Sequence, residues 1–100
     1  MDKKIVREEL KDIKYYLRHK KELEQFEPSL GKPIAYQLAK KYERAMKQGP
    51  SKLMVLYGEL YINNRTYEEL ADIWGYSFQY VARLHNDLVD YLAITLDTIE

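Results

Sequence analysis

One stretch of the sequence decides the fold: residues 66–84, which read TYEELADIWGYSFQYVARL. Thr66 is followed three residues later by Glu69, a spacing typical of a capping box at the start of a helix. In a capping box each side chain bonds the free backbone N–H of the other residue, so we expect a helix to begin at Tyr67. Gly75 should end this helix, because glycine readily adopts the left-handed conformation of a helix C-cap.

A second, longer helix is predicted directly after the glycine. Ser77 supplies its N-cap oxygen, so the helix should begin at about Phe78. Behind the cap, apolar residues recur at helical spacing, at Val81, Leu84, Leu88 and Leu92. The residues expected on the inner face of the first helix are Leu70, Ala71 and Ile73. Two capped helices joined by so short a turn predict a helix-turn-helix, a unit that usually reads DNA.

The composition predicts one small all-α domain. The chain has 100 residues, of which 46% are hydrophobic, with only four Gly and three Pro. It has no cysteine, which excludes disulfides and thiolate metal sites. The longest apolar run, residues 53–57, is far shorter than the roughly 20 residues of a membrane span. The charged N-terminus has no signal-peptide core, so we expect a cytoplasmic protein with no membrane partner.

The net charge is zero, but the charges are unevenly distributed. Residues 1–50 carry 13 Lys+Arg against 8 Asp+Glu, whereas residues 51–100 carry 3 against 8. We expect residues 1–50 to form a basic helical hairpin and residues 51–100 to form the helix-turn-helix unit, within one compact domain. Since duplex DNA is bound largely through its phosphates, an acidic helix-turn-helix half argues against DNA binding.

The other helices are predicted from the same local signals. The first spans about residues 2–26 and ends at a linker with Pro and Gly, and the second spans about residues 33–47 and pairs with it. Ser51 should cap a third helix over about residues 51–62, which an Asn63-Asn64 turn connects to the capping box. The expected core positions of these three helices are Val6, Leu10, Ile13 and Leu17, then Ile34, Leu38, Tyr42 and Ala45 or Met46, then Leu53, Leu56, Tyr57 and Leu60.

A ridge of basic residues lies beside the apolar seam of the first helix. Its members recur every three or four residues, at Lys4, Arg7, Lys11, Lys14, Arg18 and Lys21. At about 1.5 Å per residue the ridge is roughly 25 Å long. Two interpretations stay open: a solvated face with acidic neighbours, or a surface for phosphates or an acidic partner. In the second, the candidate phosphate contacts are Arg7, Lys11, Lys14, Arg18, Lys40 and Arg44.

The helix after Ser77 presents side chains suited to DNA bases. Gln79, Arg83 and Asn86 fall at i, i+4 and i+7, on one face. Gln and Asn pair bidentately with adenine, and Arg pairs with guanine. Phe78 and Tyr80 either contact DNA or form an aromatic patch for a protein partner. The candidate DNA contacts are therefore Ser77, Phe78, Gln79, Tyr80, Arg83 and Asn86.

The sequence contains no constellation typical of an enzyme. His19 and His85 lie in separate segments, without a nucleophile elbow or a His-Glu-x-x-His spacing. We therefore expect no catalytic residues, no metal and no cofactor. His85 borders the predicted apolar stripe, where a neutral, hydrogen-bonded imidazole is the expected state.

Several short segments resemble known transcription proteins. The helix ending LYGELY at residues 56–61, the turn at residues 63–65, and TYEELA followed by Gly75-Tyr76-Ser77 resemble region 4 of sigma-70-type factors, which reads promoter elements in the major groove. The Val-x-x-Leu-His pattern at residues 81–85 is similar to phage-encoded regulators of the ArpU/RinA type, which place a charged helical segment before such a module. The resemblance covers about residues 53–92, and only the general layout before that.

This resemblance implies a phage or mobile-element transcriptional regulator that binds double-stranded DNA, with RNA polymerase or another transcription factor as a further partner. We also expect a homodimer, because two half-sites would double the contacts of one short reading helix. The chain departs from these relatives, which carry Lys and Arg on the outer face of that helix, because Arg83 is its only Lys or Arg. The alternative is a degenerate helix-turn-helix that docks on, or inhibits, a transcription factor without binding DNA.

Overall fold

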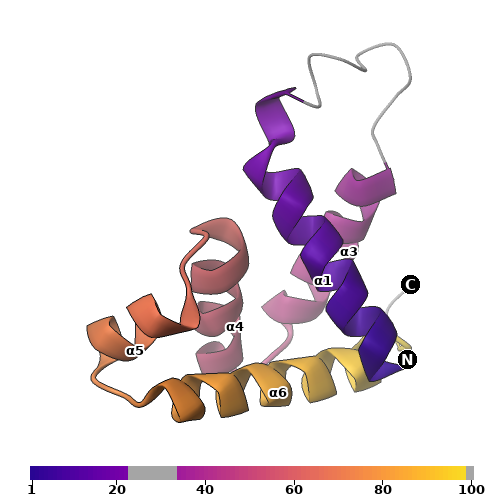
Figure 1. The fold of residues 1–100 in the computed structure, drawn as a ribbon. Helices are drawn as coiled ribbons and strands as arrows, with labels where there is room; N and C mark the ends of the chain where they lie inside the picture. The colour runs from indigo at the N-terminus through magenta and orange to yellow at the C-terminus, as the bar shows by residue number, and fades with distance from the viewer. Residues whose placement is uncertain (23–33, 99–100) are drawn as a thin grey trace.

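Helices form every regular element of the part of the chain that the computed structural model describes, residues 1–22 and 34–98. The predicted all-α class is therefore confirmed. The elements are α1 (Lys3–Arg18), α3 (Ile34–Lys47), α4 (Ser51–Tyr57), the π-helical turn η1 (Gly58–Ile62), α5 (Tyr67–Trp74) and α6 (Phe78–Thr95) (Figure 1). Within those described residues no helix has the length and apolar character needed to cross a membrane.

The long helix α6 is the base on which the other α-helices pack. In Figure 1 it runs along one side of the molecule, with α1 and α4 rising from it and α5 at its N-terminal end. Apolar side chains from all the described elements join in one buried cluster, which includes Val6, Leu10, Ile13, Tyr42, Ala45, Met46, Leu53, Leu56, Tyr57, Leu60, Leu70, Val81, Leu84, Leu88 and Leu92. This cluster fixes where α1 crosses η1 and α6, and that crossing creates the candidate site described below.

Helix α1 is shorter than predicted. Asp2 caps it by accepting a 2.7 Å hydrogen bond from the Lys4 backbone N–H, but the helix ends at Arg18 rather than near residue 26. The backbone N–H of His19 is shared between the carbonyls of Tyr15 and Tyr16, at 3.1 and 3.2 Å, which tightens and closes the last turn. Residues 20–22 are again helical, whereas the rest of the predicted helix and its linker lie outside the described residues.

Helix α3 ends at Lys47, as predicted, and its start at Pro33 lies outside the described residues. Tyr42, Ala45 and Met46 are buried, as predicted. Ile34 was predicted to be buried but is 84% exposed. It opens the helix at the rim of a surface hollow shared with Tyr15, which is itself exposed, so no other element of the described residues covers it.

The predicted third helix is divided into two elements. Ser51 is its first helical residue and not its cap, because the N-cap is Pro50, whose carbonyl accepts from the Met54 N–H at 3.0 Å. The α-helix gives way to a π turn at Gly58, and the turn closes with a 2.9 Å bond from the Asn63 N–H to the Gly58 carbonyl. The core positions predicted for this segment, Leu53, Leu56, Tyr57 and Leu60, are all buried.

The predicted caps around α5 and α6 are confirmed. The Glu69 N–H donates to Thr66 Oγ1 at 3.1 Å, and the Thr66 N–H donates to Glu69 Oε1 at 3.0 Å. Gly75 adopts the left-handed conformation, with φ of 72°, and ends α5. Ser77 Oγ then accepts from the Tyr80 N–H at 3.1 Å, so α6 begins shortly after α5 ends.

One position on the inner face of α5 was predicted wrongly. Leu70 is buried and Ala71 half-buried, but Ile73 is 57% exposed. The side of α5 that packs on the core instead carries Tyr67, Leu70, Ala71 and Trp74, spaced three, one and three residues apart. Ile73 lies off this stripe and faces outward.

Candidate nucleic-acid interface

The polar face of α6, which we define as Gln79, Arg83 and Asn86, is exposed along its length. These residues lie opposite the buried stripe of the same helix, because about 100° separates successive residues. Two acids border this face. Asp90 pairs with Lys3 of α1 at 2.8 Å, whereas Asp87 is exposed and takes part in no salt bridge of the described residues.

The other three candidate DNA contacts have structural partners. The Ser77 hydroxyl is occupied as the cap of α6. The Phe78 ring packs against Tyr67, with centroids 5.6 Å apart. The Tyr80 ring packs against Tyr76 at 4.5 Å, and its hydroxyl accepts a hydrogen bond from Lys52 Nζ on α4. Phe78 and Tyr80 therefore contact different aromatic neighbours, and Phe78 stays 47% exposed.

Three of the candidate phosphate contacts meet in one concave site, which we call the basic hollow. It has a volume of about 510 Å³ and lies where α1 crosses η1 and α6. Its lining consists of Arg7, Lys11 and Lys14 from α1, Leu60 and Tyr61 from η1, Arg65, Thr66 and Tyr67 at the start of α5, and His85 and Asn86 from α6. Asn86 thus belongs both to the polar face of α6 and to the wall of the basic hollow.

The remaining candidate phosphate contacts lie elsewhere. Arg18 lines a smaller hollow of about 220 Å³ next along the ridge, together with Lys11 and Lys14. Lys40 and Arg44 are on α3, which contacts α1, α4 and α6, and neither lines the basic hollow. Lys40 pairs with Glu43 at 3.4 Å. The α1 ridge is therefore brought to the polar face of α6, and the α3 cations are not.

The basic hollow carries positive charge that the described residues leave unpaired. Arg7, Lys11 and Lys14 take part in none of the salt bridges found in residues 1–22 and 34–98. Lys14 Nζ lies 5.9 Å from the centroid of the Tyr61 ring. Arg65, in contrast, is paired with Glu59 at 2.8 Å, so its charge is compensated.

His85 forms part of the floor of the basic hollow. Its Nε2 is hydrogen-bonded to the Tyr61 hydroxyl, and its ring lies 5.5 Å from that of Tyr67. Burial, and then the positive charges of Arg7 and Lys14, lower the pKa of His85 to about 4. The imidazole is therefore neutral at pH 7, which confirms the state expected from its place beside the apolar stripe.

Glu59, which lies outside the lining of the basic hollow, positions Arg65 of that lining and was missed from the sequence. Its carboxylate accepts from Asn63 Nδ2 at 2.7 Å and from Arg65 Nε at 2.8 Å, and its carbonyl accepts from the Arg65 N–H at 2.9 Å. Together with the left-handed Asn64, with φ of 55°, these bonds fix the turn that places Arg65 at the hollow. The spacing of Glu59, Asn63 and Arg65 could have indicated this clamp.

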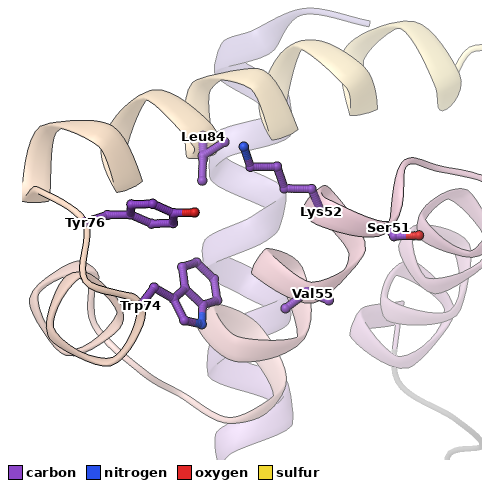
Figure 2. A pocket seen from close by; sticks show the side chains of 6 residues that line it. All are labelled: Ser51, Lys52, Val55, Trp74, Tyr76 and Leu84. Carbon is purple, nitrogen blue, oxygen red and sulfur yellow. The ribbon is translucent and has the colours of Figure 1, made fainter.

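A second concave site, which we call the apolar groove, was also missed. It has a volume of about 440 Å³ and lies between α4, the end of α5 and α6, lined by Ser51, Lys52, Val55, Trp74, Tyr76 and Leu84. Figure 2 shows the Tyr76 hydroxyl directed toward Lys52, and the Trp74 indole facing Val55. Val55 is 53% exposed and Tyr76 48% exposed, so much of this apolar surface is open to solvent.

Comparison with known proteins adds no relative. No family model matches the chain, and no curated protein or solved structure matches it. The resemblance to sigma region 4 and to the ArpU/RinA-type regulators therefore stays a prediction. Function has to be inferred from the polar face of α6, the basic hollow and the apolar groove.

Proposed function

We propose that this protein is a non-enzymatic transcriptional regulator of a phage or mobile element, acting in the bacterial cytoplasm on double-stranded DNA. In this proposal α5 and α6 act as a helix-turn-helix, and the polar face of α6 enters the major groove. Gln79, Arg83 and Asn86 support it because they are exposed and carry the groups that pair with adenine and guanine edges.

The observation that carries the proposal is the double position of Asn86. The same residue lies on the polar face of α6 and lines the basic hollow, so Arg7, Lys11 and Lys14 lie directly beside the proposed reading helix. Cations at this place would contact the DNA backbone while α6 contacts base edges. The N-terminal half thereby supplies the positive charge that the acidic C-terminal half lacks.

The acidic residues of α6 are the main objection to DNA binding, because they would repel phosphates. One of the two that border the polar face is paired with a lysine. Asp90 is paired with Lys3 at 2.8 Å, so its charge is partly compensated by α1. Asp87 stays exposed beside the polar face, where it would repel phosphates. Its repulsion, together with that of the exposed Glu68 and Asp72 on α5, has to be set against the three cations of the basic hollow, which pair with no acid of the described residues.

A selection experiment tests the proposal. The protein would be mixed with a pool of randomised duplexes, and the retained sequences would be measured by fluorescence anisotropy at about 50 mM and about 200 mM salt. We expect an enriched sequence whose affinity falls steeply with salt. Retention of no duplex at the lower salt concentration would refute DNA binding.

The apolar groove favours a second candidate, an adaptor that docks on a transcription factor or RNA polymerase. Solvent-open Val55 and Tyr76 beside Trp74 form the kind of apolar surface that protein interfaces cover. Trp74 is the only tryptophan of the chain, so its fluorescence reports directly on this groove. Purified RNA polymerase that shifts this emission, in a protein that binds no duplex, would favour the adaptor.

A further inference from the structure

We infer that the basic hollow is a binding site for a single phosphate group, held by Arg7, Lys11 and Lys14 together with the Asn86 amide. The inference rests on the proposed function only for the source of the phosphate, which is either the DNA backbone or a free phosphate compound. The chemistry is the same in both cases, since each presents a tetrahedral anion to cations and N–H donors.

The first support is the positive charge of the side chains that line the basic hollow. Arg7, Lys11 and Lys14 are at i, i+4 and i+7 on α1, so they point to one side of that helix. No carboxylate lines the basic hollow, and Glu59, which precedes Leu60 in the chain, is already bonded to Arg65. The three cations therefore share one concave space without a counter-ion from the described residues.

The second support is that the electrostatic effects of these cations converge on the floor of the basic hollow. Arg7 and Lys14, which lie two helical turns apart on α1, both disfavour the protonated form of His85. Burial raises the pKa of the Tyr67 phenol, which also lines the basic hollow, and the charge of Arg7 opposes that rise. Apolar walls such as Leu60 concentrate a field of this kind, because they exclude the water that would screen it.

The third support is shape. The basic hollow has a volume of about 510 Å³, room for a phosphate together with its ester substituents. The tetrahedral oxygens of a phosphate can meet three cations from different directions, whereas the two oxygens of a carboxylate lie in one plane. The basic hollow also borders the polar face of α6 at Asn86. If that face contacted bases, a phosphate of the same DNA backbone would lie beside it, in the basic hollow.

The test uses the full chain and nuclear magnetic resonance of the His85 ring at constant ionic strength. Inorganic phosphate is the first probe, and succinate, compared with it at pH 7 where its two carboxylates are ionised, is the matched anion without a tetrahedral phosphate. We expect phosphate to give saturable shifts confined to the lining residues and to raise the pKa of His85, because the bound anion offsets Arg7 and Lys14. Shifts that grow without saturation, or that succinate reproduces equally, would overturn the inference.

A pair of charge-matched variants separates the site from general screening. Arg7→Gln/Lys14→Gln should lose the saturable response, whereas Lys41→Gln/Lys47→Gln, with the same charge change on α3, should keep it. Arg7 is exposed, so Arg7→Gln alone serves as a milder variant if the first pair perturbs folding. Equal responses in the two double variants would contradict a defined phosphate site.

A titration of the same protein with duplex DNA identifies the source of the phosphate. A duplex that moves the same His85 resonances, and that inorganic phosphate displaces, would assign the site to the DNA backbone. Saturation by inorganic phosphate in a protein that binds no duplex would assign it to a free phosphate compound and refute the proposed function. A duplex that binds while neither probe moves His85 would refute the phosphate site and leave the proposed function standing.

Discussion

The Tyr61 hydroxyl on η1 and His85 Nε2 on α6 are joined by a hydrogen bond on the floor of the basic hollow. This bond ties the π turn to the proposed reading helix beneath the three α1 cations. The two residues are 24 positions apart in the chain, so the pair exists only in the folded protein. It makes His85 a sensitive reporter of both folding and ligand binding.

Folding stability should fall on acidification through His85. The pKa of this residue is about 4 in the folded protein, against an ordinary value of 6.5, so the unfolded chain binds the proton more readily. The contribution of neutral His85 to the free energy of unfolding is therefore fully present above about pH 6.5, and it is lost as the pH falls toward about 4. We expect a loss of about 1–3 kcal/mol from this residue, measured by urea unfolding at several pH values. His85→Gln should flatten this part of the profile, and an unchanged profile would show that other groups cause it.

The capping box should contribute measurably to stability. Thr66→Ala removes the oxygen that accepts from the Glu69 N–H and should cost about 1 kcal/mol in denaturant unfolding. Thr98→Ala is the matched control, because within the described residues its hydroxyl bonds the Thr95 carbonyl, beyond the last turn of α6. Equal effects of the two substitutions would argue against a special role for the capping box.

DNA binding should separate base contacts from phosphate contacts. Arg83→Ala should cost about 1–3 kcal/mol on a selected duplex and relax its preference at one base pair. Arg7→Ala or Lys11→Ala should instead weaken all sequences alike and reduce the salt slope by about one. Anisotropy titrations on the selected and a scrambled duplex measure both effects. Sequence preference that survives Arg83→Ala would refute the polar face of α6 as the reading surface.

A homodimer is predicted, but it cannot use the apolar seam of α1. Val6, Leu10 and Ile13 are at most 1% exposed, because α3, α6 and η1 cover them. The apolar groove is the open surface that can serve instead, so Val55→Asp should dissociate the dimer. Light scattering should give twice the 12.0 kDa chain mass for the parent protein and 12.0 kDa for the variant. A mass equal to that of one chain for the parent at tens of micromolar would exclude the dimer.

The features that could be predicted from sequence are those that neighbouring residues determine. Thr66, Ser77 and Gly75 act on backbone groups within a few positions, so the starts of α5 and α6 were predicted correctly. The cap predicted at Ser51 was wrong because Pro50 was not considered as the N-cap itself. Ile34 was placed inside because periodicity reports which side of a helix is apolar and not how far a neighbouring helix extends along it.

The candidate site was only partly predictable for the same reason. The ridge on α1 and the polar face of α6 are each visible in the spacing of their own residues. Their meeting at Asn86 depends on how α1 crosses η1 and α6, which is set by packing between distant segments. The apolar groove likewise combines α4 with the end of α5, and no local pattern brings Val55 to Trp74.

The π turn restricts how sequences of this design can vary. Between Gly58 and Ile62 the helix accommodates one residue more per turn than an α-helix would. Removing a residue there would leave the residue count of an ordinary α-helical turn, so the wider turn that places Leu60 in the core and Tyr61 against His85 would be lost. The number of residues in this turn is therefore constrained in the same way as the identity of the side chains that pack around it.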